Sequence, residues 1–171
     1  MTPSSPLPPP RQPGAYAVAL VCLGNICRSP MAHVVLESRL AKAGLDDRVS
    51  VASSGTGDWH VGEPMDRRAA ATLREHGYDP ERHRARQYDA SWLDVHDLVL
   101  VMDESNLTDV RALVPAGGEG HRVHLFRDFD PAGPGDVPDP YYGGPDGFDR
   151  VLAMVERTVD ALVEQLAEVV R

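Results

Sequence analysis

The chain has 171 residues, 42% of them hydrophobic, which is enough for one domain with a single core. Its formal net charge of −9 argues against a nucleic-acid partner, because a phosphate backbone is bound by a basic surface. The sequence shows no run of about 18 apolar residues and no basic-then-apolar leader. We therefore expect a cytoplasmic protein that does not enter a membrane.

Residues 1–14 hold six of the 15 prolines and show no periodic apolar pattern. Such a composition predicts a disordered, extended arm outside the domain, which then comprises residues 15–171. A ligand for a proline-recognition module is an alternative interpretation of the same residues.

Apolar runs and helical stretches alternate along the rest of the chain. The pattern predicts strands at 16–22, 49–52, 98–102 and 122–126, and helices at 29–43, 65–76, 104–114 and 148–169. The last helix repeats apolar residues at three and four positions along one face. This alternation predicts a single α/β domain, a doubly wound four-stranded parallel sheet with helices on both faces.

The segment with the clearest chemistry stands where the first strand hands over to the first helix. It reads Val21-Cys22-Leu23-Gly24-Asn25-Ile26-Cys27-Arg28-Ser29-Pro30. Ligands bind at this place in an open parallel sheet, and the free amides of a helix start attract anions. Gly24 and Asn25 tolerate the left-handed backbone that a tight loop needs. The sequence therefore predicts an anion-binding loop.

Three side chains of this loop suit phosphoryl transfer. The amides and the helix dipole favour the thiolate of Cys22, which is its nucleophilic form. The planar fork of Arg28 can hold two phosphoryl oxygens, and Ser29 can donate its hydroxyl to the sulfur. The two cysteines could instead form half of a zinc site, but no second pair exists and the histidines lack finger-like spacing. The glycine patterns of nucleotide-binding turns are also missing.

Residues 21–30 resemble the signature of the low-molecular-weight protein tyrosine phosphatases of bacterial type. Similar segments follow in the same order, namely Ser53-Ser54-Gly55-Thr56 before Trp59, His76-Gly77, the stretch 102–107, and Asp139-Pro140-Tyr141-Tyr142. The resemblance covers the chain from about Tyr16 to its end.

The resemblance implies that the chain hydrolyses phosphotyrosine in proteins and releases inorganic phosphate. Cys22 would be the nucleophile that forms a cysteinyl-phosphate, Arg28 the phosphate clamp, and Asp139 the general acid and then base. No metal and no other cofactor would be needed, because Arg28 and the loop donors stabilise the charge. From the residues alone, Asp139-Pro140 is more readily interpreted as a turn.

The resemblance also assigns binding and supporting residues. The phosphate-binding loop would comprise Leu23, Gly24, Asn25, Ile26, Cys27 and Ser29. Ser53 and His76 would support it, although His76 also suits a helix end that satisfies local carbonyls. Trp59, Tyr141 and Tyr142 would wall a deep slot that admits phosphotyrosine but keeps phosphoserine from Cys22. A tyrosine kinase acting on Tyr141 or Tyr142 would be a partner. Apart from the resemblance, Cys27 is close enough to Cys22 in the sequence to form a reversible disulfide with it when Cys22 is oxidised.

Two other functions fit part of the pattern. An arsenate reductase shares this fold and loop but needs a further cysteine pair, and no cysteine follows Cys27. A catalytically silent phosphotyrosine-binding module would have no use for Cys22 and Asp139.

Overall fold

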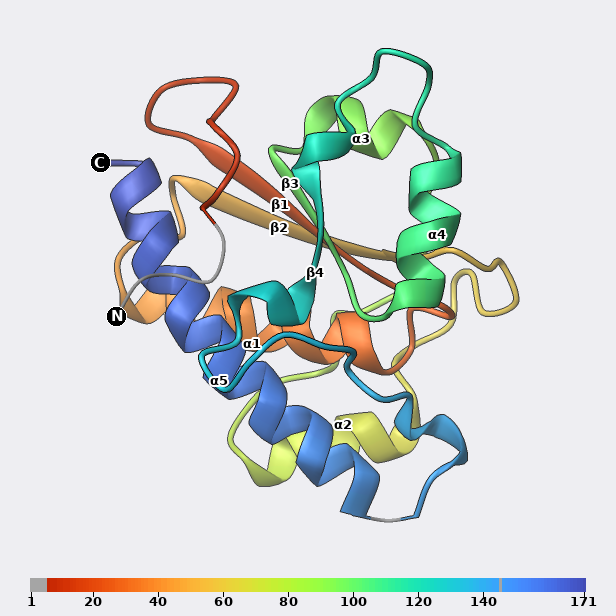
Figure 1. The fold of residues 1–171 in the computed structure, drawn as a ribbon. Coiled ribbons are helices and arrows are strands. Elements are labelled where there is room, and N and C mark those ends of the chain that lie inside the picture. Colours follow the sequence, from red (N-terminus) through yellow and green to blue (C-terminus); the bar gives the residue numbers. More distant parts are fainter. Residues whose placement is uncertain (1–5, 145) are drawn as a thin grey trace.

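The computed structural model describes residues 6–144 and 146–171, without the side chain of Tyr142. Its centre is a parallel sheet with the strand order β2-β1-β3-β4 (Figure 1). The strands are β1 (Tyr16–Cys22), β2 (Val49–Gly55), β3 (Leu98–Val101) and β4 (Val123–Leu125). The predicted single-domain α/β fold with a four-stranded parallel sheet is confirmed.

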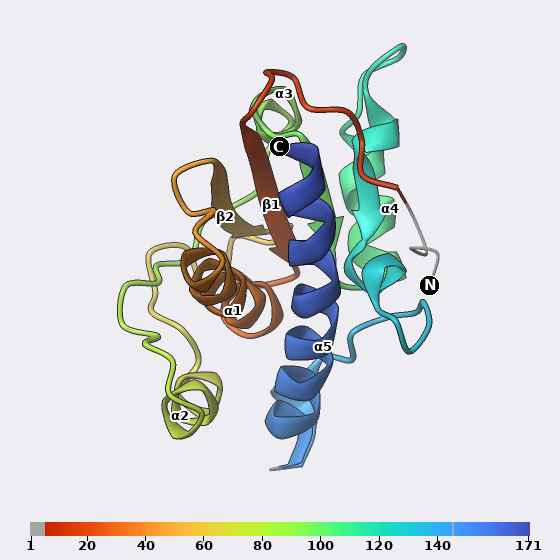
Figure 2. The same cartoon turned by 90° about the vertical axis from the view of Figure 1, so that its left-hand side faces the viewer.

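Helices cover both faces of the sheet, because alternate side chains of each buried strand point to opposite faces. Val18 and Leu20 of β1 join a core with α1 (Arg28–Lys42) and α5 (Asp146–Val169). Ala19 and Val21 join a second core with α3 (Ser91–Val95) and α4 (Glu104–Ala112). Figures 1 and 2 show α1 and α5 side by side, with α4 across the sheet from them.

The last helix has the buried face that its sequence predicts. Its apolar stripe lies in the first core, except that Val169 is only partly buried (Phe148, Leu152, Val155, Val159, Leu162, Leu166, Val169). α5 packs along α1 and also contacts α2 (Arg67–Glu75). None of the helices in the described ranges is long and apolar enough to cross a membrane.

Several element bounds differ from those predicted from the sequence, for local reasons. β2 continues past residue 52 because its pairing with β1 runs on to the Cys22–Gly55 pair. α2 begins at Arg67, since Asp66 caps it by accepting the backbone N–H groups of Arg68 and Ala69. The short helix α3 has no periodic pattern and was not predicted.

Residues 6–14 lie against the domain, whereas the sequence predicts an arm outside it. Pro8 is buried and its carbonyl accepts the hydroxyl of Tyr16 at 2.9 Å. The Pro9 carbonyl accepts a hydrogen bond from Nη1 of Arg122 at 2.8 Å, and the Arg11 backbone N–H donates to the Asp97 carboxylate at 2.7 Å. A proline-rich segment makes no internal hydrogen bonds, so its carbonyls are available to the domain. Residues 1–5 lie outside the described part.

The topology places the loop after β1 at the switch point of the sheet. The chain runs from β1 to β2 on one side and later to β3 on the other. The connections on either side of β1 diverge there, which leaves a crevice beyond its carboxyl end. Cys22 is the last residue of β1 and therefore lies at this crevice.

Candidate active site

The loop from Cys22 to Ser29 curls around the start of α1 and is held by its own polar side chains. Asn25 has the left-handed φ of 56°. Its side-chain amide donates to the Ser29 hydroxyl oxygen at 2.9 Å. That oxygen lies 3.0 Å from the Cys22 sulfur and 3.3 Å from the Ser54 carbonyl oxygen. Ser29 can therefore donate its single proton either to the sulfur or to strand β2.

Four carbonyl groups of the loop bond donors from other segments of the chain. Three of these carbonyls accept backbone N–H groups at 2.9 Å, namely Cys22 from Thr56, Leu23 from Gly57, and Ile26 from Asp66. The fourth, of Asn25, accepts Nε2 of His83 at 2.6 Å. Because the N–H and C=O groups of a peptide unit point in opposite directions, this arrangement turns the loop amides inward. It is the arrangement of an anion-binding nest.

Gly55 allows β2 to approach this loop closely. A Cβ atom at position 55 would lie 2.6 Å from the Leu23 carbonyl oxygen and 2.9 Å from the Asn25 nitrogen. Both contacts are with backbone, which cannot move aside as a flexible side chain can. Only glycine fits here without displacing the loop.

His83 contacts the loop although no sequence pattern predicts it. Burial lowers its pKa to about 4, so the ring is neutral near pH 7 and donates from Nε2 to the Asn25 carbonyl. The ring of His76, at the end of α2, bonds the Thr72 carbonyl of that helix. Nothing in the pattern around His83 distinguishes it from the six other histidines.

The Ser53 hydroxyl contacts a histidine of α1. It lies 3.2 Å from Nδ1 of His33. The neighbouring residue, Ser54, supplies the carbonyl that faces Ser29. Ser54 meets the loop through its backbone carbonyl, so this contact does not depend on a serine side chain.

Arg28 is 2% exposed and crosses from α1 to the acidic side of the pocket. It donates to the Asp103 carboxylate at 2.6 Å and to the Val137 carbonyl at 3.0 Å. Burial opposes its charge, but Cys22 and Asp103 outweigh that cost and raise its pKa. Asp103 was missed in the sequence, although it follows β3 at the same edge of the sheet as Cys22.

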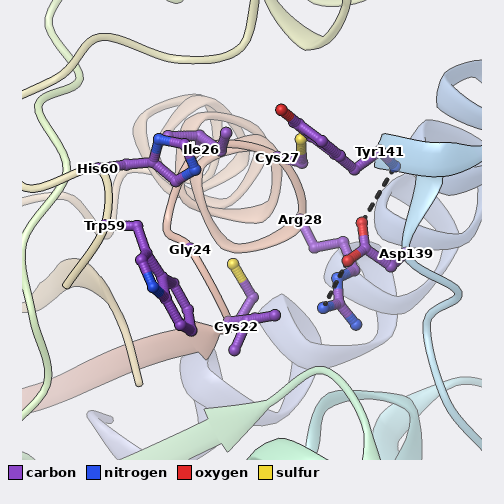
Figure 3. A pocket seen from close by; sticks show the side chains of 10 residues that line it. Cys22, Gly24, Ile26, Cys27, Arg28, Trp59, His60, Asp139 and Tyr141 are labelled. Atoms are coloured by element: carbon purple, nitrogen blue, oxygen red, sulfur yellow. Dashed lines mark hydrogen bonds and ion pairs between the residues drawn. The ribbon is translucent and has the colours of Figure 1, made fainter. Parts of the chain in front are cut away.

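Asp139 faces Arg28 across the pocket (Figure 3). Its Oδ1 accepts the backbone N–H of Tyr141 at 3.0 Å, and its Oδ2 lies 3.6 Å from Nη2 of Arg28. The carboxylate therefore caps the 3₁₀ turn Pro140–Tyr142 with one oxygen and presents the other to the pocket. Asp139 therefore caps a turn, as the residues alone suggest, and it also lines the pocket.

The pocket above the loop encloses about 330 Å³, which suits a small ligand group. Trp59 and His60 lie on one side, and Tyr141 and Asp139 lie on the other (Figure 3). Its lining comprises Cys22, Leu23, Gly24, Ile26, Cys27, Arg28, Trp59, His60, Asp139 and Tyr141. His60 was not predicted, and the prediction for Tyr142 concerns a side chain outside the described part.

The two cysteines are free and differ in their surroundings. Burial, together with Asp66 and Cys22, raises the pKa of the Cys27 thiol well above its ordinary value. Cys27 is therefore protonated near neutral pH. Cys22 lies beside the Ser29 hydroxyl and the charge of Arg28, which makes it the better placed nucleophile.

Comparisons with known proteins agree with this geometry. A family model described as "Low molecular weight phosphotyrosine protein phosphatase" matches residues 17–171. A low molecular weight protein-tyrosine-phosphatase of Streptomyces coelicolor is 47% identical over 156 residues, covering 90% of this chain and 94% of the relative. A protein tyrosine phosphatase of Entamoeba histolytica, solved with Hepes in its active site, superposes with a TM-score of 0.85 at 30% identity. It covers 90% of this chain and 98% of its own.

One relative of known structure is named for a different substrate. The YwlE arginine phosphatase, solved as a mutant with a phosphorylated active-site serine, superposes with a TM-score of 0.79 at 26% identity. The match covers 89% of this chain and 96% of that one.

Proposed function

Because this chain belongs to the low molecular weight phosphotyrosine protein phosphatase family, we propose that it hydrolyses phosphotyrosine in proteins through a cysteinyl-phosphate on Cys22. One observation carries the proposal. The pocket is lined at once by a thiol, a buried guanidinium and a carboxyl group, from Cys22, Arg28 and Asp139. These are the nucleophile, the clamp and the acid that phosphoryl transfer needs.

In the first step the Cys22 sulfur attacks phosphorus while the bond to the tyrosyl oxygen breaks. The inward-turned loop amides and Arg28 hold the three remaining phosphoryl oxygens as their charge is redistributed. Asp139 donates its proton to the departing phenolate. The products are a cysteinyl-phosphate and a neutral tyrosine side chain.

In the second step a water molecule replaces sulfur on phosphorus. Asp139, now ionised, takes a proton from the water, and the leaving Cys22 thiolate is stabilised by the hydroxyl of Ser29 at 3.0 Å. Inorganic phosphate leaves and the enzyme returns to its starting state. Each step balances without a redox reagent.

The aromatic walls favour an aryl ester. The Trp59 side chain is 68% exposed at the mouth, and Tyr141, 37% exposed, lies across from it. Two flat faces contact a tyrosyl ring over a large area, while a shorter phosphoserine would leave them uncovered. The exposed position of Tyr141 also supports the proposal that a tyrosine kinase modifies it.

Turnover of p-nitrophenyl phosphate by the wild type, Cys22→Ser and Asp139→Ala tests the proposal. Cys22→Ser is expected to lose hydrolysis, since an alcohol of ordinary acidity replaces the thiolate. Hydrolysis retained by Cys22→Ser would contradict the mechanism.

A second assay compares a phosphotyrosine peptide with a phosphoarginine peptide. We expect preference for phosphotyrosine, because the aromatic walls match its ring. Preference for phosphoarginine would change the substrate class and leave the cysteine chemistry in place.

A further inference from the structure

An arginine on α2 contacts the turn that carries the acid. The Arg68 guanidinium donates from Nη1 to the Tyr141 carbonyl oxygen at 3.0 Å. Its central carbon lies 5.2 Å from the ring centre of Tyr141 and 4.9 Å from that of Phe148. Cation–π attraction acts at these distances. Arg68 therefore holds both the backbone and the ring of Tyr141.

Asp66 fixes Arg68 from the other side. Its carboxylate caps α2 and also accepts Nε and Nη2 of Arg68, at 3.3 and 3.1 Å. Burial opposes the ionisation of Asp66, but the bonds from Arg68 and Ala69 hold its pKa below the ordinary value. The pair is thus ionised at neutral pH, and the two-bond geometry sets the direction in which the guanidinium points.

The same aspartate is attached to the nucleophile loop. The Asp66 backbone N–H donates to the Ile26 carbonyl at 2.9 Å. At the other end of the path, the Tyr141 N–H donates to Oδ1 of Asp139 at 3.0 Å. A continuous path of contacts therefore joins the loop of Cys22 to the carboxyl group of Asp139, with Arg68 in the middle.

We propose that Arg68 is a positioning residue for the protonation step, which it serves by holding Tyr141 so that Asp139 presents Oδ2 to the leaving oxygen. This rests on the proposed function, in which Asp139 is the acid. The described residues that line the pocket do not include Arg68, so its effect is carried through Tyr141. A misplaced acid still lies near the substrate but donates its proton poorly.

Esters whose leaving groups differ in acidity distinguish a role of Arg68 in protonation from a general effect on the structure of the site. Protonation matters most for esters of weakly acidic phenols, such as phosphotyrosine and phenyl phosphate, and least for p-nitrophenyl phosphate. We expect Arg68→Met to lower kcat/KM for the first two by about tenfold, and for the third by about twofold or less. Arg68→Lys should recover part of the loss, since it keeps the charge over the rings but not the fork.

Two further variants make the comparison strict. Arg67→Met is the matched control, because Arg67 is the exposed neighbour of Arg68 on the same helix. It should behave as the wild type on all three esters. In an Asp139→Ala background, Arg68→Met should cost nothing more, since two changes that act through one group are not additive.

The result that overturns the proposal is an equal loss on all esters that persists in the Asp139→Ala background, or a change in KM alone. If Asp139→Ala itself shows no dependence on the leaving group, the acid assignment fails and the role of Arg68 fails with it. If the loss in Asp139→Ala depends on the leaving group but the loss in Arg68→Met does not, Asp139 remains the acid and Arg68 does not position it. Thermal unfolding checks each variant, and Arg68→Lys decides the question if Arg68→Met does not fold.

Discussion

At the residue scale, the site depends on charged and polar side chains whose partners lie far away in the sequence. A buried charge is costly unless it is paired, and Arg28 is paired with Asp103, 75 positions away. The loop of Cys22 could be predicted from local sequence, because its residues are contiguous. Asp103 and His83 could not, since their roles arise only when the sheet brings distant segments together.

His83 supplies a pH prediction at this scale. Its folded pKa of about 4 lies below the ordinary 6.5, so the folded state binds fewer protons than the unfolded state between these values. Its contribution to stability is complete above the unfolded pKa and is lost as pH falls toward the folded one. As the pH falls from about 6.5 to about 4, the free energy of unfolding should therefore decrease less in His83→Gln than in the wild type.

Urea unfolding across that pH range measures the effect. The two stability curves should converge as the pH falls. Curves that stay parallel would show that the His83 ring is not buried in its neutral form.

At the scale of elements, sequence patterns predict helices and strands well where apolar residues repeat. They predict them poorly where polar residues form the end of an element. The stripe of α5 predicts its buried face because burial drives that helix. The end of β2 contains Ser53 and Ser54, which have a weak strand preference. The pairing with β1 that continues to Gly55 could therefore not be predicted from the sequence. The contact of this strand end with the loop is the feature that sequence alone misses.

Gly55→Ala tests that contact. A Cβ atom 2.6 Å from the Leu23 carbonyl must push the loop away from β2, so the loop amides lose their common centre. We expect a fall in kcat/KM for p-nitrophenyl phosphate of about a hundredfold. Gly120→Ala is the control, because its Cβ would lie 3.8 Å from the nearest side-chain atom. Wild-type kinetics for Gly55→Ala would show that the loop tolerates displacement.

At the scale of the whole molecule, the fold separates the site from a second set of contacts at the opposite end of the sheet. Cys22 ends β1, while Tyr16 begins it and bonds Pro8. A strand of this length spans about 20 Å. The segment 6–14 can therefore stabilise the domain without touching the chemistry, although composition alone predicted that it would lie apart.

Removal of residues 1–14 tests this separation. Several hydrogen bonds of Arg11, Pro8 and Pro9 are lost, so the free energy of unfolding should fall by about 2 kcal/mol. The kcat/KM for p-nitrophenyl phosphate should be unchanged, and removal of residues 1–5 alone is the comparison. Unchanged stability after the longer truncation would contradict a structural role for the segment.

The covalent step is the central claim, and trapping it is the most direct measurement. Asp139→Ala mixed with p-nitrophenyl phosphate should still form the intermediate, because this leaving group needs little protonation, and should hydrolyse it slowly without its base. Rapid quenching and peptide mapping by mass spectrometry then locate the phosphoryl group. We predict it on the sulfur of Cys22. Turnover with no phosphoryl group on Cys22 at any quench time, or with that group on another residue, would contradict the account.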